Sequence, residues 1–460
     1  MKLFLTLCLT LLAGGLGLAR GVTVPPALPG RPASDLYAVT VNGQAVGTEK
    51  FRTKFDLGTL PDWFTKETYT GVQQELHFAD FSGEGPMEVV LTLSEQVTKA
   101  VVHPLSRGIK PSIEGNRVSF SLAGPDKVYV VINDLPPLCV FANPPEGPPP
   151  AATAPGVRFF AAGVHRPGLM TLKSNETVYL APGALVYGGL RAEPGARNLK
   201  VVGRGVLDGG FEIEDMVKLE DCHGVEFNGI TIRNGMGWTN TLVNCTDVTY
   251  RDVKIISFGP SGDGIDPLGS SRVLIDRCFF RCTDDCIAIK SPGPEQVVHD
   301  VRITNNTMVG FACSDAVTIG FETNGPEISN VRVQNCDVVL ARGGSRVDGH
   351  SAFSIICDGP AVIHDIRFED IRVEEALKAF ELTITDGTKY EVNPPGHIRG
   401  VFLKNIVWAA HCPILLKGFD QDHRVEQVVF ENCTMAGRRL TGPADAKFEI
   451  NAFAQGIEFR

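Results

Sequence analysis

A short pattern of alternating residues recurs eight times and constrains the fold more than any other feature of the chain. Each copy places apolar residues at positions one, three and eight, with Asn or Asp favoured at position five. The copies are VEFNGITI, VTYRDVKI, VLIDRCFF, VRITNNTM, VRVQNCDV, IRFEDIRV, VFLKNIVW and VVFENCTM, beginning at residues 225, 248, 273, 301, 331, 366, 401 and 428. Alternation is the period of a β-strand, and these intervals leave no room for crossover helices. We therefore predict an all-β chain whose main part is a right-handed parallel β-helix with one copy per coil.

The fifth position of this pattern is a row of small polar residues. Its members are Asp252, Asn305, Asn335, Asp370, Asn405 and Asn432. Asn and Asp tolerate left-handed backbone geometry and form local hydrogen bonds, so we expect a structural stack of turns from coil to coil. Cysteines occupy the sixth position in three copies, at Cys278, Cys336 and Cys433. We expect these thiols to point inward and pack as small apolar groups.

Composition divides the chain into four parts. Residues 1–20 read as a secretory signal peptide, with Lys2 before an apolar run and small residues at the end. Residues 22–142 alternate like a small antiparallel β-sandwich, and the Pro-rich stretch 143–156 reads as a linker. Residues 157–460 would form the β-helix. The expected protein is secreted, periplasmic or extracellular, and has no membrane segment after removal of the signal.

Net charge and cysteine content limit the kinds of partner and of metal site that we expect. The formal net charge of -10 argues against nucleic acid, which needs a basic surface. Twelve cysteines include one in the signal peptide, so an odd number remains, and at least one thiol is free or pairs with another chain. Cys282 and Cys286 lack a second pair at zinc spacing, so we predict no metal cluster there. No feature of the sequence implies a protein partner.

Aspartates head the next strand of three consecutive coils. The runs DGIDP, DCIAIK and DAVTIG begin at Asp263, Asp285 and Asp315, and we align the preceding coil at Asn240. Strands of neighbouring coils lie about 4.8 Å apart, so these residues would form a file, with Asp284 one position upstream. Ionised carboxylates are too costly to bury in an apolar core, so we expect the chain to turn here and open a wet pocket.

Such a cluster suits acid–base chemistry. Carboxyl groups held close together acquire different pKa values, which makes a general acid and a general base from one residue type. A calcium site is the alternative, because several carboxylates also suit a hard cation.

The stretches SGDGID (261–266) and TDDCIAIK (283–290) resemble the acidic motifs of polygalacturonases, family 28 of the glycoside hydrolases. The chain is also similar to the dextranase and isopullulanase family, which carries a sandwich before its β-helix. The resemblance implies a polysaccharide substrate and no cofactor. It also implies that Asp284 protonates the leaving oxygen while Asp263 and Asp285 activate water. Inverting hydrolysis of this kind uses carboxyl groups roughly 6.5–9.5 Å apart.

The chain departs from that family at two places. Ser314, Asp315 and Ala316 stand where a G-H-G motif is expected, and no R-I-K motif occurs near residues 349–359. The histidines His350 and His423 receive no catalytic role. The residues predicted to bind substrate are Trp238, Asp266, Lys290, Asp315 and Glu322.

Two other functions compete with hydrolysis. A calcium-dependent polysaccharide lyase could use the same architecture, but it needs a basic residue placed to abstract a proton, and no arginine lies in the acidic file. A non-catalytic carbohydrate-binding β-helix is the second alternative, because fold alone does not fix function.

Overall fold

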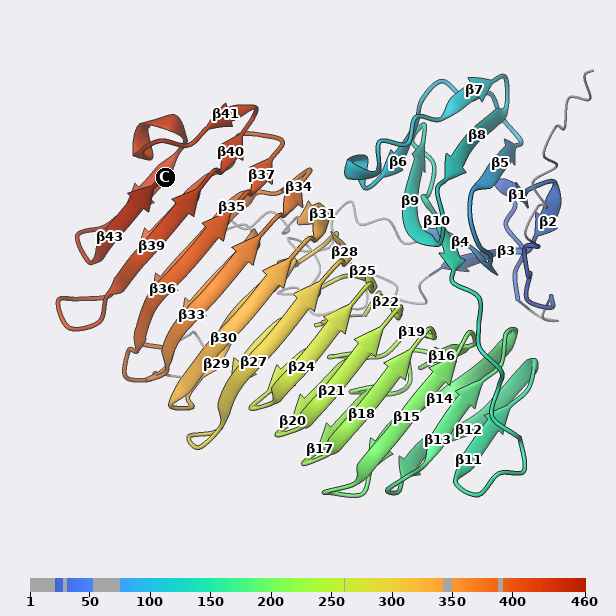
Figure 1. Cartoon of the computed structure of the whole chain (residues 1–460), viewed down its shortest axis with the longest axis horizontal. Coiled ribbons are helices and arrows are strands. Elements are labelled where there is room, and N and C mark those ends of the chain that lie inside the picture. Colours follow the sequence, from blue (N-terminus) through green and yellow to red (C-terminus); the bar gives the residue numbers. More distant parts are fainter. Residues whose placement is uncertain (1–20, 28–30, 53–74, 260, 342–349, 388–391) are drawn as a thin grey trace, which may run out of the picture.

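The computed structural model describes residues 21–27, 31–52, 75–259, 261–341, 350–387 and 392–460. The predicted signal peptide lies outside these residues. Figure 1 shows a long β-helix with a smaller two-sheet body beside its N-terminal half. The all-β fold class predicted from the sequence is confirmed. Helix within the described residues is limited to the 3₁₀ turns η2 (Leu105–Arg107) and η3 (Pro443–Asp445), and none is long and apolar enough to cross a membrane.

The smaller body is a sandwich of two five-stranded sheets. One sheet contains β2 (Gln44–Val46), β1 (Tyr37–Val41), β5 (Met87–Leu93), β8 (Arg117–Leu122) and β7 (Ser112–Glu114). The other contains β3 (Thr48–Arg52), β4 (Glu75–Ser82), β10 (Leu138–Asn143), β9 (Asp126–Ile132) and β6 (Ala100–His103). Alternate residues of β5 and β8 are buried, as expected of strands with one face in a core.

Each coil of the β-helix has three strands, which stack on those of neighbouring coils into three faces. The first face contains β11 (Val157–Phe160), β13 (Thr177–Leu180), β15 (Arg197–Gly203), β18 (His223–Asn228), β21 (Thr246–Arg251), β24 (Ser271–Asp276), β27 (Val297–Thr304), β30 (Glu327–Gln334), β33 (Val362–Glu369), β36 (His397–Lys404), β39 (Val425–Glu431) and β43 (Ala454–Phe459).

The second face contains β16 (Val206–Asp208), β19 (Thr231–Arg233), β22 (Lys254–Ile256), β25 (Phe279–Cys282), β28 (Thr307–Gly310), β31 (Asp337–Ala341), β34 (Arg372–Val373), β37 (Val407–Trp408), β40 (Thr434–Met435) and β41 (Arg438–Arg439). The third face contains β17 (Val217–Glu220), β20 (Asn240–Val243), β23 (Asp266–Leu268), β26 (Ala288–Ser291), β29 (Val317–Thr323), β32 (Ser351–Cys357), β35 (Lys378–Ile384), β38 (Ile414–Lys417) and β42 (Phe448–Ile450). The long strands β12 (Gly163–Leu172) and β14 (Ala184–Ala192) begin the coil, and β14 pairs with both β16 and β17.

The repeated segments contain a bend that the sequence pattern did not reveal. We predicted one strand per segment and a second strand after it, whereas each segment spans the end of a first-face strand and the start of a second-face strand. Asp252 separates β21 from β22 at φ 54°, and Asn335 separates β30 from β31 at φ 49°. The expectation of left-handed turn residues is confirmed. Their side chains also form a stack, since the Asn335 amide donates to Asn305 Oδ1 at 2.8 Å.

The interior of the coil is apolar along its whole length. Cys278, Cys336 and Cys433 are buried in it, as predicted. The eleven cysteines of the described residues are unpaired thiols. Phe227 and Tyr250 stack face to face on neighbouring coils, with ring centroids 4.4 Å apart. Such contacts between coils replace the single compact core of a globular domain.

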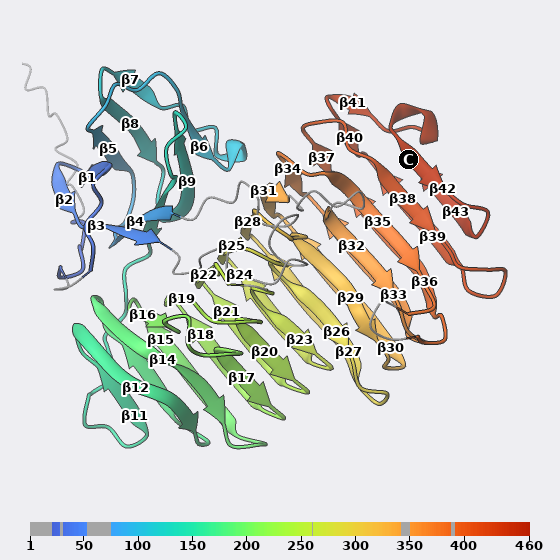
Figure 2. The ribbon, with the colours of Figure 1, turned by 180° about the vertical axis from the view of Figure 1, so that it is seen from behind.

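The sandwich packs against the second face of the coil (Figure 2). The rings of Phe141 on β10 and Phe279 on β25 meet edge to face, with centroids 5.1 Å apart. Charged pairs surround this apolar contact: Lys127 binds Asp252 at 3.0 Å. The sandwich therefore covers the face that directly precedes the turns described below.

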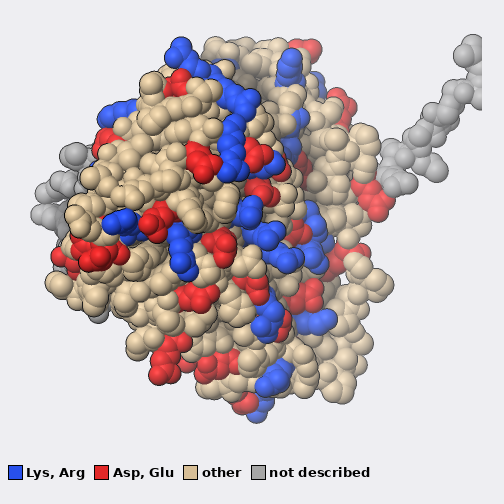
Figure 3. Space-filling model, turned by 60° about the vertical axis from the view of Figure 1, so that its left-hand side comes forward, with Lys and Arg blue, Asp and Glu red and all other residues tan. Residues whose placement is uncertain are grey.

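The far end of the coil carries charges of both signs side by side (Figure 3). Many of them pair between neighbouring coils, as Lys404 and Glu431 do at 2.7 Å and Lys417 and Glu449 do at 3.3 Å. Opposite charges therefore meet between neighbouring coils on the first and third faces. Exposed pairs of this kind contribute little to stability individually.

Candidate active site

The turns that lead from the second face to the third lie in one row along the coil. Five consecutive turns matter here, at residues 209–216, 234–239, 257–259 with 261–265, 283–287 and 311–316. Each turn is longer than a single left-handed residue, so side chains can leave the alternation of the strands. Successive turns are about one strand spacing, roughly 5 Å, apart. The predicted acids occupy the last three turns of this row.

The file of aspartates predicted from the sequence is present. Ile265 pairs with Ile287, which places Asp263 directly beside Asp285. The backbone N–H of Asp315 donates to Asp285 Oδ1 at 2.8 Å, so the third acid follows on the next coil. Three coils therefore deliver carboxyl groups to one place.

The alignment of the preceding coil was wrong by two residues. Thr241 pairs with Asp266, and the N–H of Thr239 donates to the carbonyl of Asp263 at 2.9 Å. Trp238, and not Asn240, is therefore the neighbour of Asp263. The extra residues lie in the turn, where strand alternation does not fix the register.

The three predicted catalytic acids form a tight cluster. One carboxylate oxygen from each of Asp263, Asp284 and Asp285 lies within 4.8 Å of the other two. Asp263 and Asp285 are buried, at 3% and 9% exposure, while Asp284 is partly exposed. This closest-oxygen distance is below the 6.5–9.5 Å separation of carboxyl groups that we expected, since Asp284 and Asp285 are consecutive in the chain and Asp263 lies beside Asp285 on the neighbouring coil.

Burial dominates the electrostatics of the cluster. It raises the pKa of Asp284 to about 6 and the pKa values of Asp263 and Asp285 well above their usual range. The mutual repulsion of the carboxylates acts in the same direction. Asp266 is fully buried beside them, and burial raises its pKa to about 7. Because these carboxyl groups interact, one of them can hold a proton while a neighbour is ionised.

Lys290 provides a positive charge next to these acids. It is buried, at 5% exposure, and its ammonium binds Glu322 Oε2 at 2.8 Å. It also lies 4.6 Å from the ring centroid of Trp238, in cation–π geometry. Asp263 and Asp266 raise the pKa of Lys290 through their charge, although burial opposes them. The predicted residues Trp238, Lys290 and Glu322 thus form one connected group beside the acids.

Sequence reasoning missed the role of His350. Its Nδ1 lies 3.3 Å from Asp315 Oδ1, and its Nε2 lies 3.0 Å from the Cys313 thiol. The Asp315 carboxylate and the thiol raise the pKa of His350 well above its usual value, against the effect of burial. Val317 pairs with Phe353, so His350 has the same place in its coil as Asp284 has in an earlier one. This shared position in the coil is the sequence signal that could have identified His350.

Asp315 is held by internal donors. The backbone N–H of Ser351 donates to its Oδ1 at 2.7 Å, and the hydroxyl of Ser354 donates to its Oδ2. Together with His350, these donors satisfy both oxygens, so Asp315 orients the imidazole and the neighbouring Asp285. The segment 314–316 therefore supplies a carboxylate, and the imidazole of His350 contacts that carboxylate from the next coil.

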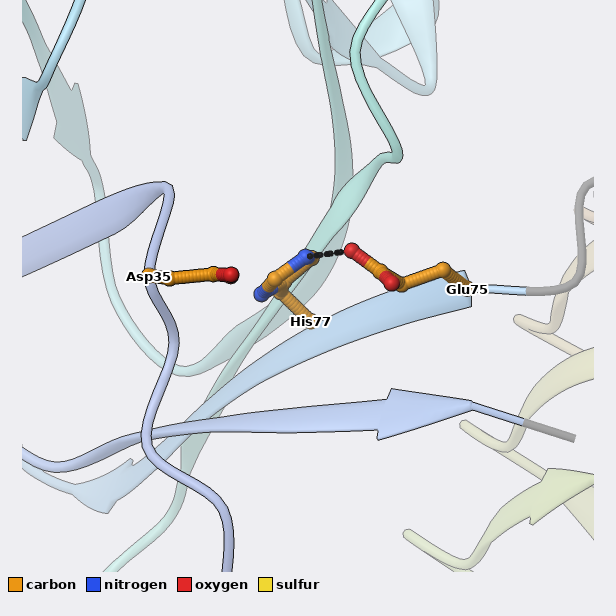
Figure 4. A group of neighbouring side chains, drawn as sticks. All are labelled: Asp35, Glu75 and His77. Atoms are coloured by element: carbon orange, nitrogen blue, oxygen red, sulfur yellow. Dashed lines mark hydrogen bonds and ion pairs between the residues drawn. The ribbon is translucent and has the colours of Figure 1, made fainter.

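A second group of titratable side chains lies in the sandwich, away from the row of turns (Figure 4). His77 Nε2 lies 3.1 Å from Glu75 Oε1, and Asp35 faces the same ring. Lys50 pairs with Asp35 at 2.9 Å and with Glu75 at 3.3 Å. The two carboxylates therefore already share a cation from the neighbouring strand, and we assign this group a structural role.

Comparison with known proteins places these features in a family context. Residues 204–408 match the sequence model of Glycosyl hydrolases family 28. Polygalacturonase QRT2 of Arabidopsis thaliana is 24% identical over 243 residues, which are 48% of this chain and 53% of that protein. The matched stretches of the curated relatives span from 28% to 58% of their lengths. These matches confirm the resemblance to polygalacturonase-like proteins of family 28.

Solved structures confirm the fold. Dex49A from Penicillium minioluteum superposes with a TM-score of 0.60 at 12% identity, covering 95% of this chain and 96% of that one. The hyperthermoactive exopolygalacturonase from Thermotoga maritima gives a TM-score of 0.54 at 17% identity, covering 66% of this chain and 84% of that one. The first of these matches extends over the sandwich as well as the β-helix.

Proposed function

We propose that this protein is a glycoside hydrolase that cleaves a polysaccharide by acid–base catalysis at Asp263, Asp284 and Asp285. One observation carries the proposal: three carboxyl groups from neighbouring coils meet within 4.8 Å, inside the segment that matches family 28. Burial raises all three pKa values, so acid and base forms coexist in the cluster near pH 6. No metal or organic cofactor takes part in the proposed mechanism.

The roles follow from exposure and neighbours. Asp284 is the most exposed of the three, so it is the carboxyl group best placed to donate a proton to the leaving oxygen. The backbone N–H of Asp315 donates to Asp285, and the positive charge of Lys290 lowers the pKa of Asp263. Both contacts favour the ionised form of the carboxyl group concerned. These two carboxylates would activate the water. In this assignment Lys290 provides the charge that balances the cluster as the proton moves.

The stereochemical outcome is a separate part of the proposal. The resemblance to family 28 implies inversion, whereas carboxyl groups as close as these are usual in retaining enzymes. We propose inversion on the basis of the resemblance. Proton NMR of the first-formed product decides the point, since retention would show the substrate's own anomeric configuration before mutarotation.

Substrate class and location belong to the same proposal. The similar proteins are named as polygalacturonases, and the sequence also resembles the dextranase and isopullulanase family, so pectic polymers and neutral α-glycans are the first candidates. A polymeric substrate of this kind is met outside the cytoplasm, in keeping with the predicted signal peptide. Ser314, Asp315 and Ala316 depart from the family pattern, so substrates other than polygalacturonate are tested as well.

The experiment is a screen for new reducing ends. Purified protein is incubated with polygalacturonate, rhamnogalacturonan, dextran, pullulan and galactan at pH 5, in parallel with an Asp284→Asn variant. The proposal expects hydrolysis of at least one polymer by the native protein and loss of nearly all turnover in the variant. Equal activity of the two proteins would disprove the assignment. An unsaturated product absorbing in the near ultraviolet would instead identify a lyase.

A further inference from the structure

A crevice of about 610 Å³ opens at the N-terminal end of the row of turns. Its lining includes Arg166, Leu169, Tyr187, Arg191, Glu212 and Glu214. This volume lies within the range usual for sites that bind small molecules or single units of a polymer. The crevice is separate from the acidic cluster, and the proposed chemistry does not use it.

The crevice lies on the same row as the acids. It is built around the turn 209–216, and Glu214 on this turn bridges to Met236 on the next turn. That next turn, 234–239, carries Trp238 and lies beside the turn of Asp263. The crevice is therefore two coils from Asp263, roughly 10 Å along the axis, and Trp238 lies between them.

The side chains of the crevice are arranged as a polar binding surface with an aromatic platform. The guanidinium of Arg166 stacks on the ring of Tyr187, with its carbon 4.2 Å from the ring centroid. Arg191 is fixed by bonds to main-chain carbonyls, at 2.6 Å to Asp215 and at 3.0 Å to Glu214. Leu169 adds an exposed apolar side chain, at 53% exposure. Stacking surfaces combined with fixed donors and acceptors suit the apolar faces and hydroxyl groups of a sugar.

The backbone of this region leaves no space for larger residues. A Cβ at Gly188 would lie 2.3 Å from the carbonyl oxygen of Gly168, and a Cβ at Gly209 would lie 2.5 Å from that of Asn234. Glycines at these positions let neighbouring coils approach closely beneath the crevice. The crevice is thus part of the coil architecture.

We propose that this crevice is a distal subsite for the glycan, holding a sugar unit of the chain whose scissile bond lies at the acids; the inference rests on the proposed function. The polymer would lie along the axis of the coil, over Trp238, between the crevice and the acidic cluster. Three of the residues that form it, Arg166, Tyr187 and Arg191, precede the segment that matches family 28 at residues 204–408. The family match therefore does not assign this crevice, and a subsite here would favour long substrates over short ones.

Binding and turnover are tested separately. An Arg166→Ala/Tyr187→Ala variant removes the platform, and Glu212→Gln perturbs the exposed turn more gently. Arg197→Ala, on the first face, is the matched control. In an Asp284→Asn background, affinity electrophoresis in gels containing polygalacturonate, dextran or galactan measures binding without cleavage. We expect at least a tenfold loss of affinity for the bound polymer in the double variant, a smaller loss in Glu212→Gln and no change in the control.

The same substitutions are then measured in the otherwise native protein, with the polymer and with its oligosaccharides. We expect kcat/KM to fall on the polymer and to remain unchanged on disaccharides, which are too short to reach from the acids to the crevice. Unchanged affinity and unchanged polymer kinetics in both crevice variants would overturn the subsite, as would failure of all three polymers to bind. Loss of binding in the double variant without hydrolysis by the native protein would overturn the proposed function and show that the crevice binds glycan without cleavage at the acids.

Discussion

Replacing Asp284 with Asn should remove both the activity and its decline at alkaline pH. Burial raises the pKa of this residue to about 6, while the charges of His350 and Lys290 act in the opposite direction. If Asp284 is the proton donor, kcat/KM of the native protein follows the protonated fraction of this carboxyl group. That fraction is about 0.9 at pH 5 and about 0.1 at pH 7 for a pKa of about 6.

The size of the effect follows from these values. Between pH 5 and pH 7, kcat/KM of the native protein should fall roughly tenfold, and above pH 7 by a further factor of about ten per pH unit. Loss of a general acid costs about 10²–10⁴ in rate, so Asp284→Asn should retain at most about one hundredth of the activity at pH 5. Its residual activity should no longer decline between pH 5 and pH 7.

The assay measures initial rates of reducing-end formation below saturation, from pH 4 to pH 8. Asp247→Asn is the matched control, because Asp247 is exposed and pairs with Arg272 at 2.7 Å on the opposite side of the coil. His350→Gln tests the electrostatics: the protonated imidazole lowers the pKa of Asp284, so its removal should move the alkaline decline to higher pH.

Two results would refute this reasoning. Activity that rises from pH 5 to pH 7 in the native protein would show that an ionised group, and not a proton donor, limits the rate. Retention of the alkaline decline in Asp284→Asn, together with its loss in Asp263→Asn or Asp285→Asn, would assign the donor to another member of the cluster.

Two further predictions concern stability. The folded pKa of Asp266 is about 7, above its usual 3.8, so the folded state favours the proton and its stability falls as pH rises through this range. The unfolding free energy of the native protein therefore falls between pH 5 and pH 8, and Asp266→Asn should make this fall smaller by about 2–3 kcal/mol. Urea unfolding at the two pH values measures the difference. An unchanged pH dependence in the variant would contradict the raised pKa of Asp266. Asn335 lies in the left-handed region at φ 49°, so Asn335→Val should lower the unfolding free energy by about 1–3 kcal/mol. Asn335→Gly should lower it by less, and equal losses in the two variants would contradict a backbone cause.

The stacking of coils could be predicted from the sequence, but the number of faces could not. In VTYRDVKI, Val248 and Tyr250 point inward before the bend at Asp252, and Val253 and Ile255 point inward after it. The apolar pattern continues through the bend because both strands line the same interior. Alternation reports which side chains are buried and carries no information on the direction of the chain.

The acids of the site could be predicted because their strands keep the register. The burial of Lys290 could not be predicted, since its outward position in the alternation does not show that Trp238 and Glu322 cover it. His350 was missed because its contact with Asp315 crosses between coils over 35 positions in the chain. Contacts of this kind depend on the lengths of the intervening turns, which have no periodic signal.

All the side chains proposed to meet the glycan belong to one edge of the coil or flank it. The strands on either side are fixed by inward residues that stack on their neighbours above and below. A turn on this edge can therefore be exchanged without disturbing the stack. Natural variation or protein engineering could in this way alter sugar preference one turn at a time, while the stacked strands keep the thermal stability of the coil.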